Sequence, residues 1–471
     1  MYALLFNLLL VLFRIAYVTF YPLDLTPEEA QYWDWSRHLD LSYYSKPPMV
    51  AYLNYATRNL FGVSELAVRI TPIVLSFLLS MFTYMFVEKL FDRRSAIVAS
   101  TLPQLTVGFS FNSLLMTTDA PFIFFWSLSV MLLFFAFEKN SLSLWLFSGF
   151  VAGLAFLSKY PAVFLLPSTL LFALVYKRRL LKHYKPYTSL LPAFLLSLPV
   201  LYWNYKHNFV SFKHVFTLAS KSAGLINLSS FLEFIGGQLL LLSVIPFLLL
   251  PFLWLEGLKD EKKSFLVIFS LPPFLFFLML SLFKKVETNW SGFSYFTALI
   301  LVSLYLSKSR LLIPTYALCF LMFLTTHFTP LLDIVGIGKL LPPRKDATKA
   351  GIGWYELGSV VSQLRKAEEK VISPQYQISA ELAFYVKGNQ RTYCINLGRR
   401  MNQYDLWVKD YQGDAIFVDY RPIDESVLSA SEQIVEEIKL PIFWRGEKIR
   451  EFYIYKLKNL KKVKEKETMG Y

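Results

Sequence analysis

The sequence predicts an α-helical membrane protein that crosses the bilayer many times and ends in a small soluble α/β domain. Of its 471 residues, 55% are hydrophobic, and the mean hydropathy is +0.42. Stretches such as 123–137 and 265–283 are apolar and contain no charged residue. In lipid, such a stretch satisfies its own backbone hydrogen bonds as a helix. This composition excludes an ordinary water-soluble enzyme.

We predict about eleven transmembrane helices. The expected spans are residues 2–20, 66–88, 95–112, 120–138, 142–158, 160–176, 187–203, 236–256, 264–283, 291–307 and 310–328. The first of them lacks a basic start and a small-residue cleavage site, so we expect it to be an anchor and not a cleaved signal peptide.

The positions of Lys and Arg predict the orientation, because short basic loops stay on the cytoplasmic side of a membrane. Every second loop is basic: 91–94, 138–140, 177–185, 259–263 and 308–310. The N-terminus is then cytoplasmic, and the loop 21–65 and the C-terminal domain lie on the other side. These loops and a basic tail account for the net charge of +14. That charge suits anionic membrane lipids and gives no reason to expect a nucleic acid partner.

The chain is expected to divide into a transmembrane domain, 1–329, and a soluble domain, 330–471, because the apolar density falls beyond residue 329. Predicted strands are 370–373, 392–396, 415–420 and 451–457, and predicted helices are 376–386 and 426–438, in a pattern that resembles βαβ. This part of the sequence has no Gly-rich phosphate loop and no metal cluster, so packing, a lid or acceptor recognition is favoured over catalysis. With only Cys319 and Cys394 present, we expect no disulfide framework.

The first outer loop combines a helix start with chemically active side chains. Thr26 and Glu29 fit an N-cap and a capping box, with a proline in the first turn. This structural role accounts for Glu29 and, through the helix dipole, partly for Glu28. Glu28 shares a helix face with Tyr32, and Lys46 follows just before a Pro-Pro pair. A carboxylate, a phenol and an ammonium group are together able to hold a phosphate and deprotonate an acceptor hydroxyl.

Four more polar residues lie at the outer ends of predicted spans, and each has two interpretations. Asp119 is either an N-cap before a proline or a carboxylate that faces a cavity, because a charge beside hydrocarbon is costly. Lys159 either snorkels to the interface or binds a ligand. His207 and Asn289 lie near tryptophans, so they belong either to an aromatic interface belt or to a substrate site. The five histidines show no spacing typical of a metal site.

Several short segments, taken in order, resemble the GT-C glycosyltransferases, the superfamily of the protein O-mannosyltransferases and the lipid A aminoarabinose transferases. These segments are EEAQYW (28–33), YYSKPP (43–48), TDAP (118–121), SKY (158–160), WN (203–204), NW (289–290), AELAFY (380–385) and NQYDLW (402–407). Each is weak alone, but their order and their common outer side make the set specific. The resemblance implies a GT-C fold and inverting transfer of a sugar from a polyprenyl-phosphate donor.

The resemblance also implies roles for single residues. Glu28 matches the catalytic acid of the first loop, usually Asp, and Asp119 matches the second carboxylate. The residues that match positions around the lipid phosphate are Tyr32, Tyr43, Lys46 and Lys159, and further candidates for substrate binding are Glu29, His207 and Asn289. Ser45 stands where the aminoarabinose enzymes carry an acidic residue associated with a bound metal. We therefore expect no required cofactor, and the sequence does not support a divalent metal.

The function implied is transfer of a sugar from a polyprenyl-phosphate donor to an envelope acceptor, with lipid A or the lipopolysaccharide core as the first choice. The implied location is the bacterial inner membrane, with the active site and the C-terminal domain facing the periplasm. Two alternatives stay open: a protein O-glycosyltransferase with the same type of donor, and a transporter or flippase of lipid-linked sugars. A transporter favours buried mid-span charges and symmetric halves, and the sequence shows no repeat.

Overall fold

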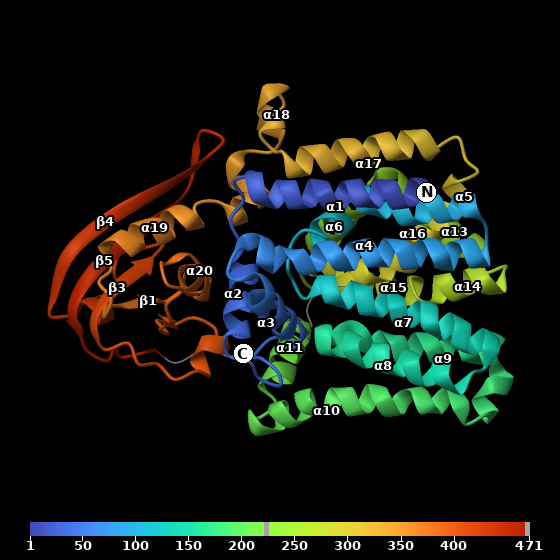
Figure 1. Cartoon of the computed structure of the whole chain (residues 1–471), viewed down its shortest axis with the longest axis horizontal. Coiled ribbons are helices and arrows are strands. Elements are labelled where there is room, and N and C mark those ends of the chain that lie inside the picture. Colours follow the sequence, from blue (N-terminus) through green and yellow to red (C-terminus); the bar gives the residue numbers. More distant parts are fainter. Residues whose placement is uncertain (221–225, 467–471) are drawn as a thin grey trace.

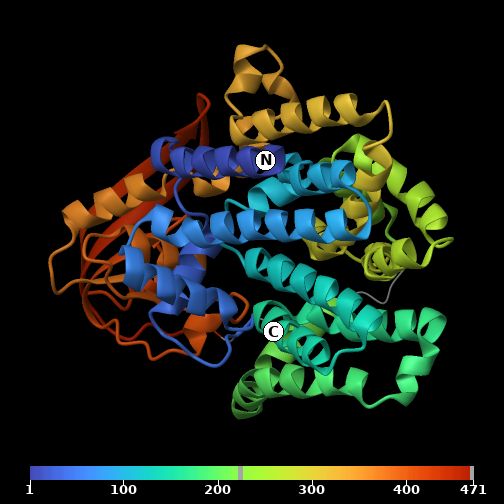
Figure 2. The ribbon, with the colours of Figure 1, turned by 45° about the vertical axis from the view of Figure 1, so that its right-hand side comes forward.

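The computed structural model describes residues 1–220 and 226–466, and it consists of a helical bundle joined at one end to a β-sheet domain (Figure 1). A view turned by 45° shows the same arrangement (Figure 2). The end of the bundle that meets the sheet domain is also where the first long loop lies. The fold therefore brings the loop 21–65 and the C-terminal domain together.

Within the described residues, four helical segments are long and apolar enough to cross a membrane: α1 (Tyr2–Phe20), α4 (Glu65–Leu90), α7 (Asp119–Lys139) and Glu261–Ser281. Shorter apolar helices occupy other predicted spans, among them α8 (Leu142–Ser158), α9 (Leu165–Tyr176) and α17 (Leu312–His327). The prediction of a multi-pass membrane protein is confirmed. The number of about eleven spans stays a prediction.

Several predicted spans are interrupted. The stretch 95–112 divides into α5 (Arg93–Thr101), a 3₁₀ turn and α6 (Val107–Asn112), because Pro103 has no backbone N–H with which to continue the first helix. The predicted span 236–256 is not one continuous helix. There, α12 (Leu228–Leu242) and α13 (Val244–Gly257) meet at Ser243 with a bend of 105°.

The remaining helices of the bundle are α10 (Leu190–Lys206), α11 (Val210–Ser220), α14 (Glu261–Ile268), α15 (Leu271–Ser281), α16 (Tyr295–Leu306) and α18 (Leu331–Ile334). The core between them is rich in aromatic rings that meet edge to face, such as Phe134 with Phe265, whose centroids are 5.2 Å apart. This packing holds α7 in the middle of the bundle, with Asp119 at its first turn.

The first long loop folds into α2 (Pro27–Ser36) and α3 (Met49–Phe61), which lie between the bundle and the sheet domain (Figure 1). The predicted capping box is confirmed, because the Thr26 side chain accepts from the backbone N–H of Glu29 and the Glu29 carboxylate accepts from the backbone N–H of Thr26 at 3.0 Å. Local sequence thus sets where α2 begins.

The C-terminal domain is a five-stranded sheet in the order β2-β1-β3-β5-β4. Its strands are β1 (Lys370–Ser373), β2 (Thr392–Cys394), β3 (Gly413–Asp419), β4 (Gln433–Trp444) and β5 (Glu447–Leu460), and its longer helices are α19 (Trp354–Leu364) and α20 (Tyr376–Tyr385). The predicted βαβ unit is confirmed, because β1 and β2 are parallel and α20 connects them.

The predicted helix 426–438 is wrong. Only α21 (Glu425–Leu428) is helical there, and the chain then enters β4, which pairs along its length with β5. The two strands are joined at Arg445 and Gly446, both of which have positive φ. Positive φ at both central residues is typical of the tight turn that matches the twist of a hairpin. Long-range pairing with β5 therefore overrides the local helical pattern.

The sheet domain is tied to the first loop by hydrogen bonds. The Tyr404 hydroxyl donates to the Asp34 carboxylate at 2.8 Å, and the Gln403 side-chain oxygen accepts from the backbone N–H of Tyr44 at 2.6 Å. Ala380 and other residues of α20 pack against α2 in one apolar cluster. These contacts close the C-terminal domain over the loop that carries the predicted site.

Candidate active site

Four ionic residues that the sequence singled out converge at the end of the bundle that faces the sheet domain. Glu28 lies in the first turn of α2, Lys46 just before α3, Asp119 at the start of α7 and Lys159 directly after α8. The charges of Glu28, Asp119 and Lys159 all act on Lys46. Segments far apart in the sequence thus place two carboxylates and two ammonium groups in one site.

Asp119 is held on both of its carboxylate oxygens. The Lys159 ammonium donates to Oδ1 at 2.6 Å, and the Asn289 amide donates to Oδ2 at 2.9 Å. Lys159 is buried and therefore does not snorkel into solvent. Asp119 thus joins Lys159 and Asn289, and both of its oxygens already accept hydrogen bonds.

Lys46 presents a cationic group that the protein itself does not neutralise by direct contact. Burial and the nearby Lys159 ammonium lower the pKa of Lys46, and the charges of Glu28 and Asp119 oppose that shift. Among the described residues, no hydrogen bond or ion pair to the Lys46 ammonium group is found. A half-buried ammonium with spare donors is suited to an anionic ligand.

The two adjacent glutamates have opposite environments. Glu28 is exposed, and its carboxylate has no hydrogen bond or ion pair within the described part of the chain. Glu29 is 0% exposed. Its Oε1 accepts from Arg69 Nε at 3.0 Å and from the backbone N–H of Met116 at 3.0 Å, and its Oε2 accepts from Arg69 Nη2 at 2.9 Å.

Glu29 therefore has a structural role, and its binding of a substrate stays a prediction. Burial by itself would raise the pKa of Glu29, but the charge and hydrogen bonds of Arg69 more than offset this, so the pKa lies below its usual range. Both oxygens are occupied inside the protein. Glu28 is the carboxylate of this pair that can meet a substrate.

The two predicted tyrosines also differ. Tyr32 lies one turn after Glu28, and burial together with the charge of Glu28 raises the pKa of Tyr32 well above its usual range. Its hydroxyl is therefore neutral and able to donate. The Tyr43 hydroxyl lies 3.1 Å from the backbone oxygens of both Trp35 and His38. The Tyr43 side chain thus stabilises the loop through these hydrogen bonds, and it is fully buried.

His207 lies apart from the ionic cluster. Its ring stacks on Trp203, and its Nδ1 lies 2.8 Å from the backbone oxygen of Trp203. The histidine that the fold brings to the site is His214 of α11. Burial and the charges of Lys46 and Arg400 lower the pKa of His214 to about 4. At neutral pH this imidazole is uncharged.

Arg400 and Tyr376 are site residues that sequence reasoning missed. Arg400 follows β2, and its charge acts on His214. Burial, together with the nearby charge of Glu28, raises the pKa of Tyr376 at the start of α20. Both come from the C-terminal domain, and no local signal in the sequence connects them with the first loop.

A cavity of about 180 Å³ adjoins Asp119 and Asn289. Its other walls are mainly apolar and include Phe109 of α6, Ile123 of α7 and Leu241 of α12. An apolar space beside an ionic cluster is able to take a ligand that has both a charged and a hydrocarbon part.

The residues present fit a divalent metal poorly. Hard cations take several free carboxylate or carbonyl oxygens. The Asp119 oxygens already accept from an ammonium and an amide, and Ser45 supplies no carboxylate. Within the described residues, no three His, Cys, Asp or Glu side chains are grouped to hold a metal ion.

The chain is similar to known membrane glycosyltransferases. Residues 45–203 match the family model described as dolichyl-phosphate-mannose-protein mannosyltransferase. The lipid A galacturonosyltransferase RgtD of Rhizobium johnstonii is 29% identical over 300 residues, which is 62% of each chain. The undecaprenyl phosphate-α-4-amino-4-deoxy-L-arabinose arabinosyl transferase 2 of Proteus mirabilis is 26% identical over 288 residues, 53% of this chain and 50% of that one. The chain thus spans between half and two thirds of the length of these relatives.

The fold is also that of a solved structure. The apo crystal structure of ArnT from Cupriavidus metallidurans superposes with a TM-score of 0.67 over 96% of this chain and 97% of the other, at 14% sequence identity. At that identity, the likeness speaks for the fold alone. The family model and the relatives show that the chain is similar to polyprenyl-phosphate-sugar glycosyltransferases of the GT-C superfamily.

Proposed function

We propose that this protein is an inverting glycosyltransferase that moves a sugar from a polyprenyl-phosphate donor to lipid A. The observation that carries the proposal is the convergence of an exposed carboxylate, Glu28, with the uncompensated ammonium group of Lys46. The relatives support the two substrates, since one is named for lipid A and the other for undecaprenyl phosphate. The sugar itself stays open.

In this mechanism Lys46 binds the donor phosphate. When the bond between the anomeric carbon and the phosphate oxygen breaks, both electrons stay on that oxygen and the phosphate gains a second negative charge. An ammonium group at that position stabilises the transition state more than the ground state. Lys159 adds to the positive field, and Asp119 holds it in place through their ion pair.

Glu28 acts as the general base. It takes the proton of the acceptor hydroxyl while the acceptor oxygen attacks the anomeric carbon from the side opposite the phosphate, so the configuration inverts. Each Asp119 oxygen already accepts a hydrogen bond, from Lys159 or Asn289, whereas the Glu28 carboxylate accepts none among the described residues. We therefore assign Asp119 and Asn289 to positioning, and only Glu28 to proton transfer.

The phosphate is already a leaving group, so the mechanism needs positioning, a base and positive charge, and we propose no metal or other cofactor. We further propose that the site faces the periplasm at the inner membrane, where a lipid acceptor is accessible. The basic loops at the far end of the bundle support this orientation.

The direct test reconstitutes the purified protein with a polyprenyl-phosphate-linked sugar and lipid A in the presence of a chelator of divalent cations. The expected product is lipid A heavier by one sugar residue, with the anomeric configuration inverted relative to the donor. A reaction without lipid A serves as the control. Transfer to protein, or movement of the donor across the membrane without a product, would contradict the proposal in favour of one of its alternatives.

Topology can be tested by labelling single cysteines. In a background in which the two buried native cysteines are replaced, we expect Leu41→Cys and Arg421→Cys to react with a membrane-impermeant reagent from the periplasmic side. Lys182→Cys lies in a basic loop and should react only after the membrane is opened. All three positions are exposed. Labelling of Leu41→Cys and Arg421→Cys from opposite sides would rule out one shared site.

Donor affinity should depend on pH through Lys46. An ordinary lysine has a pKa of about 10.4. The pKa of Lys46 is lowered, so Lys46 loses its proton at a lower pH than an ordinary lysine does. Only the ammonium form attracts phosphate, so donor binding is expected to weaken on the alkaline side, before an ordinary lysine would titrate. Lys46→Arg should remove this pH dependence, and Lys46→Ala should weaken binding about tenfold or more at neutral pH.

The measurement is equilibrium binding of polyprenyl phosphate from neutral to alkaline pH. Lys206→Ala removes a different, exposed lysine at the end of α10 and serves as the matched control. Unchanged affinity in Lys46→Ala at all pH values would remove Lys46 from the phosphate site.

A further inference from the structure

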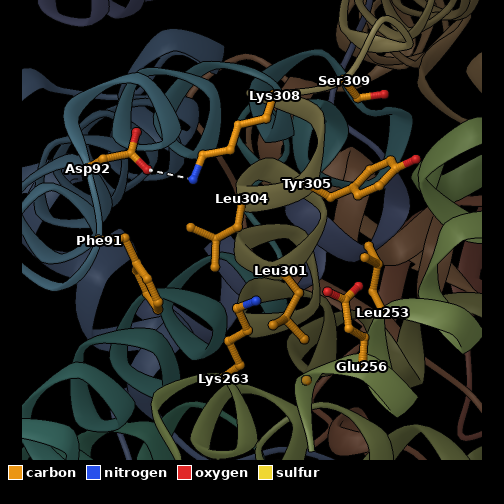
Figure 3. Close-up of a pocket in the computed structure, with 11 residues that line it drawn as sticks. Phe91, Asp92, Leu253, Glu256, Lys263, Leu301, Leu304, Tyr305, Lys308 and Ser309 are labelled. Carbon is orange, nitrogen blue, oxygen red and sulfur yellow. Dashed lines mark ion pairs between the residues drawn. The ribbon is translucent and has the colours of Figure 1, made fainter. Parts of the chain in front are cut away.

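A second pocket lies at the opposite end of the bundle from the candidate active site. Figure 3 shows this pocket in close-up. Its volume is about 670 Å³, and it is formed where α4, α13 and α16 end and α14 begins. α16 starts near Asn289 and ends at this pocket, and its 12 residues span roughly 18 Å at the rise of an α-helix. The pocket is therefore separate from the site that holds Asp119.

The pocket combines apolar walls with balanced charges. Leu253 and Leu301 are buried in its wall. Its charged residues are Asp92, Glu256, Lys263 and Lys308, so their formal charges sum to zero. An apolar chamber with both signs of charge suits an amphipathic ligand whose polar part is itself zwitterionic.

Two of these four charged residues have no partner among the described residues. Asp92 accepts from Ser95 as the cap of α5 and lies 3.9 Å from Lys308. Glu256 and Lys263 are half-buried, and in the part of the chain that the structure describes neither side chain forms a hydrogen bond or ion pair. Figure 3 shows the Glu256 carboxylate and the Lys263 ammonium group both directed into the pocket, from α13 and α14. Half-buried charges without partners are costly unless a ligand or water compensates them.

The surroundings place this pocket at the level of lipid headgroups. Lys259 lies between α13 and α14, Lys262 lies in the first turn of α14, and Arg310 follows α16. Basic residues directly at the ends of apolar helices lie where the membrane meets water. A ligand of this pocket would enter from the headgroup layer.

We propose that this pocket binds the headgroup of a phosphoethanolamine phospholipid. The phosphate would pair with Lys263, and the ammonium group of the headgroup would pair with Glu256. The apolar walls would cover the glycerol and the first acyl methylenes. An anionic headgroup without an amine would satisfy Lys263 but leave Glu256 facing negative charge, so the pocket discriminates between the two lipid classes. This inference does not depend on the proposed function.

The test is lipid binding by the full-length protein in detergent, with equal amounts of phosphatidylethanolamine and phosphatidylglycerol, and with bound lipids identified by native mass spectrometry. The native protein is expected to retain about tenfold more phosphatidylethanolamine than phosphatidylglycerol. Glu256→Gln should abolish or reverse that preference, whereas Glu256→Asp, which keeps the charge, should largely retain it. Lys263→Gln should weaken binding of both lipids about tenfold.

Lys182→Gln is the matched control, because it removes an exposed lysine at the same end of the bundle. Thermal unfolding of each variant in the same detergent separates loss of the site from loss of the fold. An unchanged lipid ratio in Glu256→Gln, with an unchanged unfolding temperature, would overturn the proposal. Displacement of the bound lipid by an equal concentration of free phosphoethanolamine would also overturn it, because the apolar walls would then contribute nothing.

Discussion

Replacement of Glu28 by Gln is expected to lower turnover by about a hundredfold to ten-thousandfold, which is the typical contribution of a positioned general base. The amide has the size of the carboxylate but cannot accept the proton of the acceptor hydroxyl. Donor binding should survive, since Lys46 carries that interaction. Single-turnover kinetics with a lipid-linked sugar measures the loss, and equilibrium binding of polyprenyl phosphate shows that the donor site remains.

Glu28→Asp provides a matched control, because it keeps the carboxylate and shortens the side chain by one methylene. We expect it to retain more activity than Glu28→Gln. If Glu28→Gln transferred sugar at nearly the native rate, α2 would not supply the base. A large loss of donor affinity in the same variant would instead place Glu28 in donor binding.

Replacement of the neighbouring Glu29 by Gln is expected to destabilise the protein by about 3–5 kcal/mol, the usual cost of breaking a buried ion pair on one side. Both side chains of the Glu29 and Arg69 pair are 0% exposed. The amide would keep much of the capping box but leave the Arg69 guanidinium without a counter-charge. From the sequence alone, retained capping predicts a mild effect, and the buried pair with Arg69 is the reason to expect a larger one.

Thermal or denaturant unfolding in detergent measures this loss. Glu28→Gln is the matched control, because it makes the same chemical change one residue away at an exposed position, and its unfolding midpoint should stay near that of the native protein. Glu29→Gln combined with Arg69→Met should be less destabilised than Glu29→Gln alone, since no unpaired charge remains. Equal midpoints for the two single variants would show that the buried pair contributes little.

Several features were predictable because they arise from residues close together in the chain. The apolar stretches predicted α1, α4 and α7 with nearly correct ends. The capping box predicted the start of α2. Alternating strands around a short helix predicted the βαβ unit of the C-terminal domain. Each depends on interactions within about four residues or on the uniform polarity of one segment.

The sequence also predicted most of the ionic cluster, because its residues lie in short motifs at the ends of apolar segments. It gave Glu29 a capping role, but it did not show which candidate side chains are bound by residues distant in the chain. Glu29 is bound to Arg69, 40 residues away. Asp119 is bound to Asn289, 170 residues away. The Tyr43 hydroxyl is held against the backbone of its own loop.

The sequence by itself thus determined a multi-pass helical membrane protein with an α/β end domain and a charged first loop, since hydrophobicity and capping act locally. The tertiary structure decided that residues 433–444 form a strand, that the chain bends at Ser243 and that Arg400 and Tyr376 reach the site. Each of these outcomes depends on a partner distant in sequence. Local patterns do not specify such partners, because the free energy that selects them comes from burial and pairing in the assembled fold.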